Sequence, residues 1–222
     1  MILFPHMAIR YVIGIDEVGR GPVAGPVAVG VFAVAASSEK QAKATLKKIC
    51  KGVKESKQLS EKNRENWFKK IQDKIETSKK ATQGTFLNFS VAFQSERIVD
   101  SKGISFAIKK SMSIAISKLA LKPAECVVLL DGGLKAPAEF VRQKTIIKGD
   151  VKEPVIALAS ICAKVLRDRY MRKLAKKYPQ YGFDIHKGYG TKAHYTALKK
   201  HGMALPHRRT FLKRLAKKAD MR

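Results

Sequence analysis

Short apolar runs alternate along this chain with longer segments in which apolar residues recur every three or four positions. A short apolar run is typical of a buried strand, whereas a recurrence of three or four residues is typical of an amphipathic helix. The pattern predicts strands at residues 11–16, 27–35, 85–93 and 126–131, with a further strand-like unit at 144–150. It predicts helices at residues 41–50, 60–75, 104–119, 154–177, 192–200 and 210–218.

The order of these elements indicates the fold class. Only a short turn rich in glycine and proline separates the first two strands, so we expect them to pair antiparallel, because a parallel crossover needs a dozen residues or more. The later strands alternate with helices, which favours an α/β domain on a mixed sheet flanked by helices.

Charge is spread unevenly along the 222 residues. The chain has 45 lysines and arginines against 18 aspartates and glutamates, a net charge of +27, and residues 164–222 alone have 18 basic and three acidic residues, a net charge of +15. We therefore expect a core over residues 1–163 and a basic helical part over residues 164–222, packed on the same domain. Such a field attracts polyanions. Because 45% of the residues are hydrophobic, a disordered basic tail is excluded.

The sequence argues against a membrane-bound or secreted protein. Its apolar run at residues 23–36 is broken by glycine and proline and is shorter than the roughly 20 residues of a spanning helix. The first residues lack the basic start of a secretory signal. Cys50, Cys126 and Cys162 show no C-x-x-C spacing, which favours reduced thiols in the core of a cytoplasmic protein. We expect a monomer.

Acidic residues stand at the ends of three apolar runs. Asp16 and Glu17 follow the first run, Asp131 ends the run at 126–131, and Asp150 ends the unit at 144–150. Ligands gather at the carboxyl ends of strands in open α/β sheets, and acids that converge there repel one another unless a cation lies among them. Mg²⁺ and Mn²⁺ both prefer such oxygen ligands. The alternative is that each acid pairs with a nearby lysine or arginine.

The turn at residues 19–26 contains three glycines and two prolines, but it lacks the spacing of a nucleotide-binding loop. It is either a tight hairpin turn or a place where backbone approaches a sugar or phosphate closely, with Arg20 adding a charge.

Seven ordered blocks make the chain similar to the ribonuclease HII family, the type 2 ribonucleases H. They begin with Asp-Glu-Val-Gly-Arg-Gly-Pro after the first strand and lie at residues 16–22, 56–60, 130–132, 148–150, 159–168, 186–191 and 206–211. The resemblance implies a ribonuclease H-like fold. It also implies hydrolysis of the phosphodiester 5′ of ribonucleotides embedded in duplex DNA or RNA–DNA hybrids, leaving a 3′-hydroxyl and a 5′-phosphate.

The resemblance also implies roles for particular residues. Asp16, Glu17, Asp131 and Asp150 would be the catalytic acids and would hold Mg²⁺ or Mn²⁺, two ions in the substrate complex. Gly19, Arg20 and Gly21 would recognise the 2′-hydroxyl through the backbone, Tyr189 would lie against the sugars at the RNA–DNA junction, and Lys57 would lie near substrate phosphates.

A second reading is a non-catalytic nucleic-acid binder, such as a ribosome-associated protein, in which the acids merely pair with lysines. A pure binder has no need of a row of carboxylates that repels phosphate.

Three other features of the sequence are expected to be structural or to lie at the surface, without a role in catalysis. We expect Asp168 to pair with its neighbours Arg167, Arg169 and Arg172, Lys164 to be solvated, and His186, His194, His201 and His207 to lie at the surface or face phosphate.

Overall fold

A computed structural model describes residues 8–50, 59–80 and 85–213 and contains a five-stranded mixed sheet in the order β3-β2-β1-β4-β5. The strands are β1 (Tyr11–Val18), β2 (Val27–Ala35), β3 (Leu87–Gln94), β4 (Cys126–Asp131) and β5 (Gln143–Ile146). β1 and β2 pair antiparallel, as predicted, and so do β2 and β3. β1, β4 and β5 run parallel. The α/β class and the mixed sheet are therefore confirmed.

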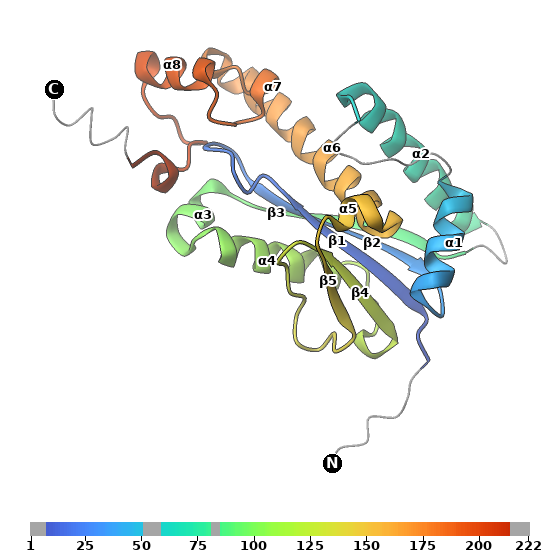
Figure 1. Cartoon of the computed structure of the whole chain (residues 1–222). Coiled ribbons are helices and arrows are strands. Elements are labelled where there is room, and N and C mark those ends of the chain that lie inside the picture. The colour runs from blue at the N-terminus through green and yellow to red at the C-terminus, as the bar shows by residue number, and fades with distance from the viewer. Residues whose placement is uncertain (1–7, 51–58, 81–84, 214–222) are drawn as a thin grey trace.

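Helices cover both faces of the sheet (Figure 1). They are α1 (Glu39–Ile49), α2 (Glu61–Lys80), α3 (Glu96–Lys102), α4 (Ile104–Ser117), α5 (Gly149–Lys152), α6 (Pro154–Lys177), α7 (Phe183–His186) and α8 (Lys192–His201), with 3-10 turns at Pro123–Glu125, Pro179–Tyr181 and Arg209–Leu212. Alternate residues of β1 face opposite layers, because Val12 packs with α1, α2 and α6 whereas Ile13 packs with α4. The sheet is thus buried on both sides.

Helix α6 lies directly on the central strands. A Cβ atom added at Gly14 of β1 would come within 2.3 Å of the Val155 backbone at the start of α6, so only glycine allows this approach. Pro154 occupies the first turn, where its missing N–H costs nothing. This close packing brings Ser160 of α6 to Asp16 at the end of β1.

The C-terminal part has a small core of its own. It unites the second half of α6 with α7 and α8, and it includes Val23 and Ala24 from the turn after β1. The boundary expected between residues 163 and 164 falls inside α6, so both parts share that helix. A helix is expected at 210–218, and the structure describes this segment only as far as residue 213. The described part forms a 3-10 turn at Arg209–Leu212.

Two other expectations can be compared with the described part of the chain. Cys50, Cys126 and Cys162 are free and buried, as expected of thiols in a core. Among the described helices, none combines the length and the apolar character that crossing a bilayer requires.

Candidate active site

The register of the parallel strands places the first acids side by side. Ile15 of β1 pairs with Leu130 of β4, so that Asp16 and Asp131 follow at the same level on neighbouring strands. Asp16 is only 4% exposed. It accepts a hydrogen bond from the backbone N–H of Glu17 through Oδ1 at 2.8 Å.

Asp150 reaches the same region from a different element than predicted. The expected strand unit at 144–150 ends early, because β5 stops at Ile146 and Asp150 lies in the first turn of the short helix α5. Lys148, with φ at +55°, makes the turn between the two elements. The Gly149 N–H donates to Asp131 Oδ1 at 2.7 Å, which ties the start of α5 to the end of β4.

The charges of these acids act on one another. Burial, together with the charges of Asp131, Glu17 and Asp150, raises the pKa of Asp16 to about 7, against the lowering effect of a hydrogen bond from Ser160. Burial also raises the pKa of Glu17, which Arg20 opposes. The Arg20 guanidinium lies 3.5 Å from Glu17 Oε1. The structure therefore brings the four predicted acids within electrostatic reach of each other.

This donor set fits a hard divalent cation in its chemistry. All four side chains offer carboxylate oxygens, and a cation would relieve the repulsion that raises the pKa of Asp16. Their present arrangement is not a closed ligand cage: within the described residues, no three His, Cys, Asp or Glu side chains are placed so that they could hold one ion. Arg20 contacts Glu17, and the Gly149 N–H occupies an oxygen of Asp131.

The expected substrate-reading residues also meet. A Cβ atom added at Gly21 would lie 3.9 Å from Cε1 of Tyr189, and Tyr189 is 44% exposed, as expected. The N–H groups of Val23 and Ala24 donate to the Gly188 carbonyl at 2.9 and 3.2 Å. The turn after β1 and the segment that carries Tyr189 thus form one surface. Lys57 lies outside the described residues.

Two of the histidines expected at the surface are buried instead. His194 is fully buried and His207 is 2% exposed, because their rings pack against Tyr181 and Phe183 in the C-terminal core. The two Nε2 atoms lie 3.1 Å apart, and His194 Nδ1 lies 2.9 Å from the Tyr189 carbonyl. The surface prediction was wrong for this pair, whose rings support the backbone of Tyr189.

Asp168 forms ion pairs, but not with the predicted partners. Its carboxylate lies 2.8 Å from Lys164 Nζ and 3.7 Å from Arg64 Nη2. Lys164 is therefore an ion-pair partner rather than a merely solvated side chain. The arginines expected to pair with Asp168 bind elsewhere: Arg169 and Arg172 reach Glu65 on α2, and Arg167 turns to backbone carbonyls.

Sequence reasoning missed Arg167 and Arg208, both buried beneath the turn after β1. A signal existed for Arg167, since it lies four residues after Ala163 and four before Met171 and shares their buried helix face. Nothing in the pattern near Arg208 predicted its burial.

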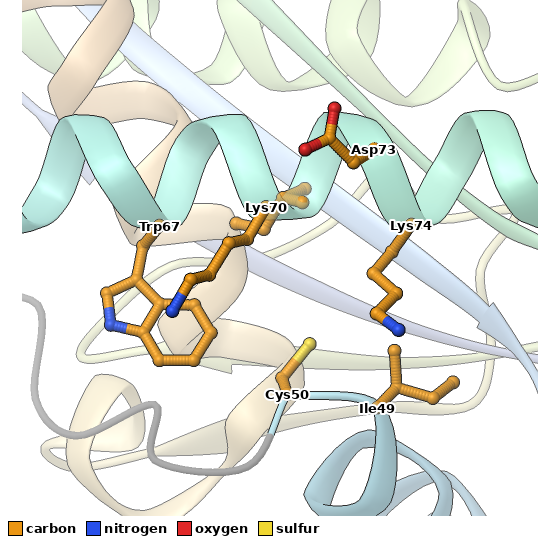
Figure 2. A pocket seen from close by; sticks show the side chains of 7 residues that line it. Ile49, Cys50, Trp67, Lys70, Asp73 and Lys74 are labelled. Atoms are coloured by element: carbon orange, nitrogen blue, oxygen red, sulfur yellow. The ribbon is translucent and has the colours of Figure 1, made fainter.

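A pocket of about 270 Å³ lies away from the acids, between the end of α1 and one face of α2 (Figure 2). Ile49, Cys50 and Ile71 line it beside Trp67, with Lys70 and Lys74 nearby. Burial raises the pKa of the Cys50 thiol to about 11, which is the opposite of what a nucleophilic thiol requires. The pocket therefore adds nothing to the acidic site.

Solved structures define the class of this protein as ribonuclease H-like. The crystal structure of ribonuclease H2 from Pyrococcus horikoshii OT3 superposes with a TM-score of 0.70 at 26% identity, covering 96% of this chain and 100% of that chain. The ribonuclease HII of a PCNA complex from Archaeoglobus fulgidus gives a TM-score of 0.65 at 26% identity, covering 89% and 93%.

Sequence comparison identifies the family within that class. The family model for ribonuclease HII matches residues 13–217. Ribonuclease HII of Caldicellulosiruptor bescii is 42% identical over 206 residues, covering 93% of this chain and 88% of the relative. That of Prochlorococcus marinus is 44% identical over 203 residues, covering 91% and 88%. The chain belongs to the ribonuclease HII family and is a ribonuclease of the H type, a hydrolase.

Proposed function

We propose that this protein is an endoribonuclease that cleaves RNA–DNA hybrids, and duplex DNA containing ribonucleotides, on the 5′ side of a ribonucleotide. The products are a 3′-hydroxyl and a 5′-phosphate. The observation that carries the proposal is the meeting of four acids at the ends of β1 and β4 and the start of α5, where burial and mutual repulsion raise the pKa of Asp16 to about 7.

Asp16, Glu17, Asp131 and Asp150 would hold Mg²⁺ or Mn²⁺, two ions in the substrate complex. Bound ions of this kind lower the pKa of a water for in-line attack and stabilise the departing oxygen. The protein itself supplies four carboxyl groups on two strands and a helix start, and their side chains would have to turn toward a common point, away from Arg20 and Gly149 N, to share a cation.

The turn after β1 would provide selectivity. The backbone of Gly19, Arg20 and Gly21 is proposed to bind the 2′-hydroxyl, the group that distinguishes RNA from DNA and is both a donor and an acceptor. Tyr189, partly exposed next to Gly21, would lie against the neighbouring sugar. Lys57 would contact a substrate phosphate.

The proposal is tested with a labelled DNA duplex that carries one ribonucleotide, incubated with Mg²⁺, with Mn²⁺ or with a chelator. We expect cleavage 5′ of the ribonucleotide only when metal is present. Asp131→Asn should lose cleavage by orders of magnitude while still binding the duplex, because asparagine keeps the oxygen that accepts from Gly149 and removes only the charge.

Asp184→Asn is the matched control, because Asp184 is exposed and lies outside the acidic site. It should cleave like the wild type. If the wild type binds the duplex but does not cut it with either metal, the protein is a nucleic-acid binder and the enzymatic proposal fails.

A further inference from the structure

Two arginines without an acidic ion-pair partner in the described part of the chain are buried beneath the turn after β1. Arg167, on α6, and Arg208, near the end of the described chain, are both fully buried, and none of the ion pairs found among the described residues involves either of them. An enclosed charge is costly unless hydrogen bonds satisfy it. Each guanidinium group donates three hydrogen bonds to backbone carbonyls.

Arg167 joins the end of the turn to the segment before Tyr189. It donates from Nε to the Pro26 carbonyl at 2.9 Å and from Nη2 to the Ala24 carbonyl at 3.3 Å. Its Nη1 donates to the Lys187 carbonyl at 3.0 Å. One rigid fork therefore holds two segments that are more than 160 residues apart in the sequence.

Arg208 holds the start and the end of the same turn. Its Nη2 donates to the Gly19 carbonyl at 2.7 Å and its Nη1 to the Arg20 carbonyl at 3.1 Å. Its Nε donates to the Gly25 carbonyl at 3.0 Å. Two of its three acceptors thus belong to the residues proposed to read the 2′-hydroxyl.

The turn is shaped to fit these arginines. Gly19 has a φ of +87°, and a Cβ atom there would come within 2.3 Å of Arg167 Nε, so glycine is required for the conformation and for the contact. The backbone adds further links, since Arg208 N donates to the Val23 carbonyl and Gly25 N to the Pro206 carbonyl, both at 2.8 Å.

Arg208 is itself held in place from outside. Asp100, in the last turn of α3, accepts hydrogen bonds from the backbone N–H groups of Arg209 and Thr210 at 2.8 and 3.0 Å. Burial lowers the pKa of Arg208 to about 10, so that this guanidinium stays charged at neutral pH. Each arginine therefore presents a fixed fork of charged donors to the turn.

We propose that Arg167 and Arg208 are positioning residues that hold the backbone of Gly19, Arg20 and Gly21 at a fixed distance from Tyr189, and that this spacing sets the preference for an RNA–DNA junction. The inference rests on the proposed function, which assigns those groups to the substrate. The arginines act through the backbone, because each of them donates to three backbone carbonyls of the turn and its neighbouring segment.

Lysine is the informative substitution. It keeps the positive charge, but a single ammonium cannot donate in a plane to three separate carbonyls as a guanidinium does. Arg208→Lys should therefore free part of the turn without removing the charge. Arg209→Lys is the matched control, since Arg209 is the next residue in the chain and its side chain is exposed.

The experiment compares kcat/KM on two substrates, a duplex with one ribonucleotide and a continuous RNA–DNA hybrid. We expect Arg208→Lys to lower the junction-to-hybrid ratio about 10-fold or more, since a displacement of 1 Å can reduce a rate 100-fold. Arg167→Lys should act in the same direction, and Arg209→Lys should leave the ratio unchanged.

A double-mutant cycle distinguishes positioning from general destabilisation. Tyr189→Ala should lower the ratio by itself, and adding Arg208→Lys to it should lower the ratio no further, because both changes break one unit. A variant that is merely less folded would lose activity equally on both substrates. An unchanged ratio in folded Arg208→Lys and Arg167→Lys would overturn the proposal.

Amide hydrogen exchange of the wild type tests the same idea without any variant. The N–H groups of Val23, Ala24 and Gly25 should be as protected as those of β1, since they donate to Gly188 and Pro206. Exchange at the rate of an open loop would contradict the proposal. If the wild type cleaves neither substrate, the proposed function fails, while the exchange result still shows whether the turn is held.

Discussion

Asp16 is the residue at which stability and the proposed activity conflict. It is 4% exposed, and burial together with three neighbouring acids raises its pKa to about 7. In the unfolded chain the same group ionises near pH 4. The folded protein without metal therefore loses stability as the pH rises from about 4 to about 7, and the loss is complete above pH 7.

Asp16→Asn should consequently stabilise the metal-free protein. Asparagine keeps the oxygen that accepts from Glu17 N and removes the charge. With chelator at pH 8, we expect urea unfolding to give a gain of up to about 4 kcal/mol, the free energy that corresponds to a pKa near 4 in the unfolded chain and about 7 in the folded protein. The gain should fade toward pH 4, and cleavage should be lost. The exposed Asp184→Asn should change stability by less than about 0.5 kcal/mol. A loss of stability in Asp16→Asn would show that the ionised Asp16 carboxylate does not destabilise the folded protein.

His194 gives the stability of the folded protein a pH dependence opposite to that from Asp16. Burial, together with the nearby rings of His186 and His207, lowers its pKa to about 4, against a raising effect from the Tyr189 carbonyl. Because the unfolded chain binds this proton near pH 6.5, the contribution is constant above that pH and stability falls as the pH drops from about 6.5 to about 4.

The measurement compares unfolding free energies at pH 7.5 and pH 5 for the wild type and for His194→Gln. The wild type should lose more stability than the variant, in which no ring takes up a proton. His201→Gln, at an exposed position, should show the wild-type dependence. Equal losses in the wild type and His194→Gln would mean that other groups dominate this pH range.

Among the helices, the contact between α2 and α6 includes one buried carboxylate, besides the more exposed ion pairs of Arg169 and Arg172 with Glu65. Asp168 is 2% exposed and lies between Lys164 and Arg64. Removing one partner of an enclosed ion pair leaves the others uncompensated. Asp168→Ala should therefore reduce the unfolding free energy by about 2–4 kcal/mol, less than for a fully enclosed pair because the Lys164 side chain is 25% exposed.

Glu76→Ala is the control for that prediction. Glu76 also pairs with a lysine, Lys79, at 2.9 Å, but both side chains are more than half exposed. Exposed pairs of this kind contribute little to stability, because water screens the two charges. Similar effects from both substitutions, measured by urea unfolding, would show that burial does not govern the contribution of Asp168.

The elements that the sequence predicted well are those whose apolar pattern is set by local burial. The spans of β2 and α6 agree with the structure, and α2 begins at Glu61, one residue from the predicted start. The acids of β1 and β4 were predictable because strand ends define one edge of a sheet. Asp150 was misplaced, because a left-handed residue starts a new helix that hydrophobic periodicity does not reveal.

Groups that depend on contacts between distant segments could not be predicted in this way. His194 and His207 are polar in the sequence, yet their rings are buried against Tyr181 and Phe183 once α8 packs beside the 3-10 turn at Pro179–Tyr181. Arg208 satisfies carbonyls that lie more than 180 residues earlier in the chain. Only the three-dimensional fold shows that such side chains form hydrogen bonds with the backbone rather than with solvent.

Over the whole molecule, much of the positive charge in the C-terminal part is not available to a ligand. Arg167 and Arg208 are buried, and four other cations pair with acids: Lys164, Arg169, Arg172 and Lys187. Exposed lysines remain on α8, the helix that begins just after Tyr189. The binding field should therefore come from fewer charges than the net +15 of this part suggests.

Salt dependence of binding measures those charges directly. Each phosphate that a lysine neutralises contributes about 0.9 to the slope of log K against log salt. Replacing Lys192, Lys199 and Lys200 of α8 by glutamine should reduce the slope for a ribonucleotide-containing duplex by up to about 2.7. The matched control replaces Lys40, Lys47 and Lys48, exposed lysines of α1, which lies at the opposite end of the molecule from α8 (Figure 1). If long-range charge alone attracted the duplex, both triple variants would weaken binding equally; contact through α8 requires that only the first one changes the slope.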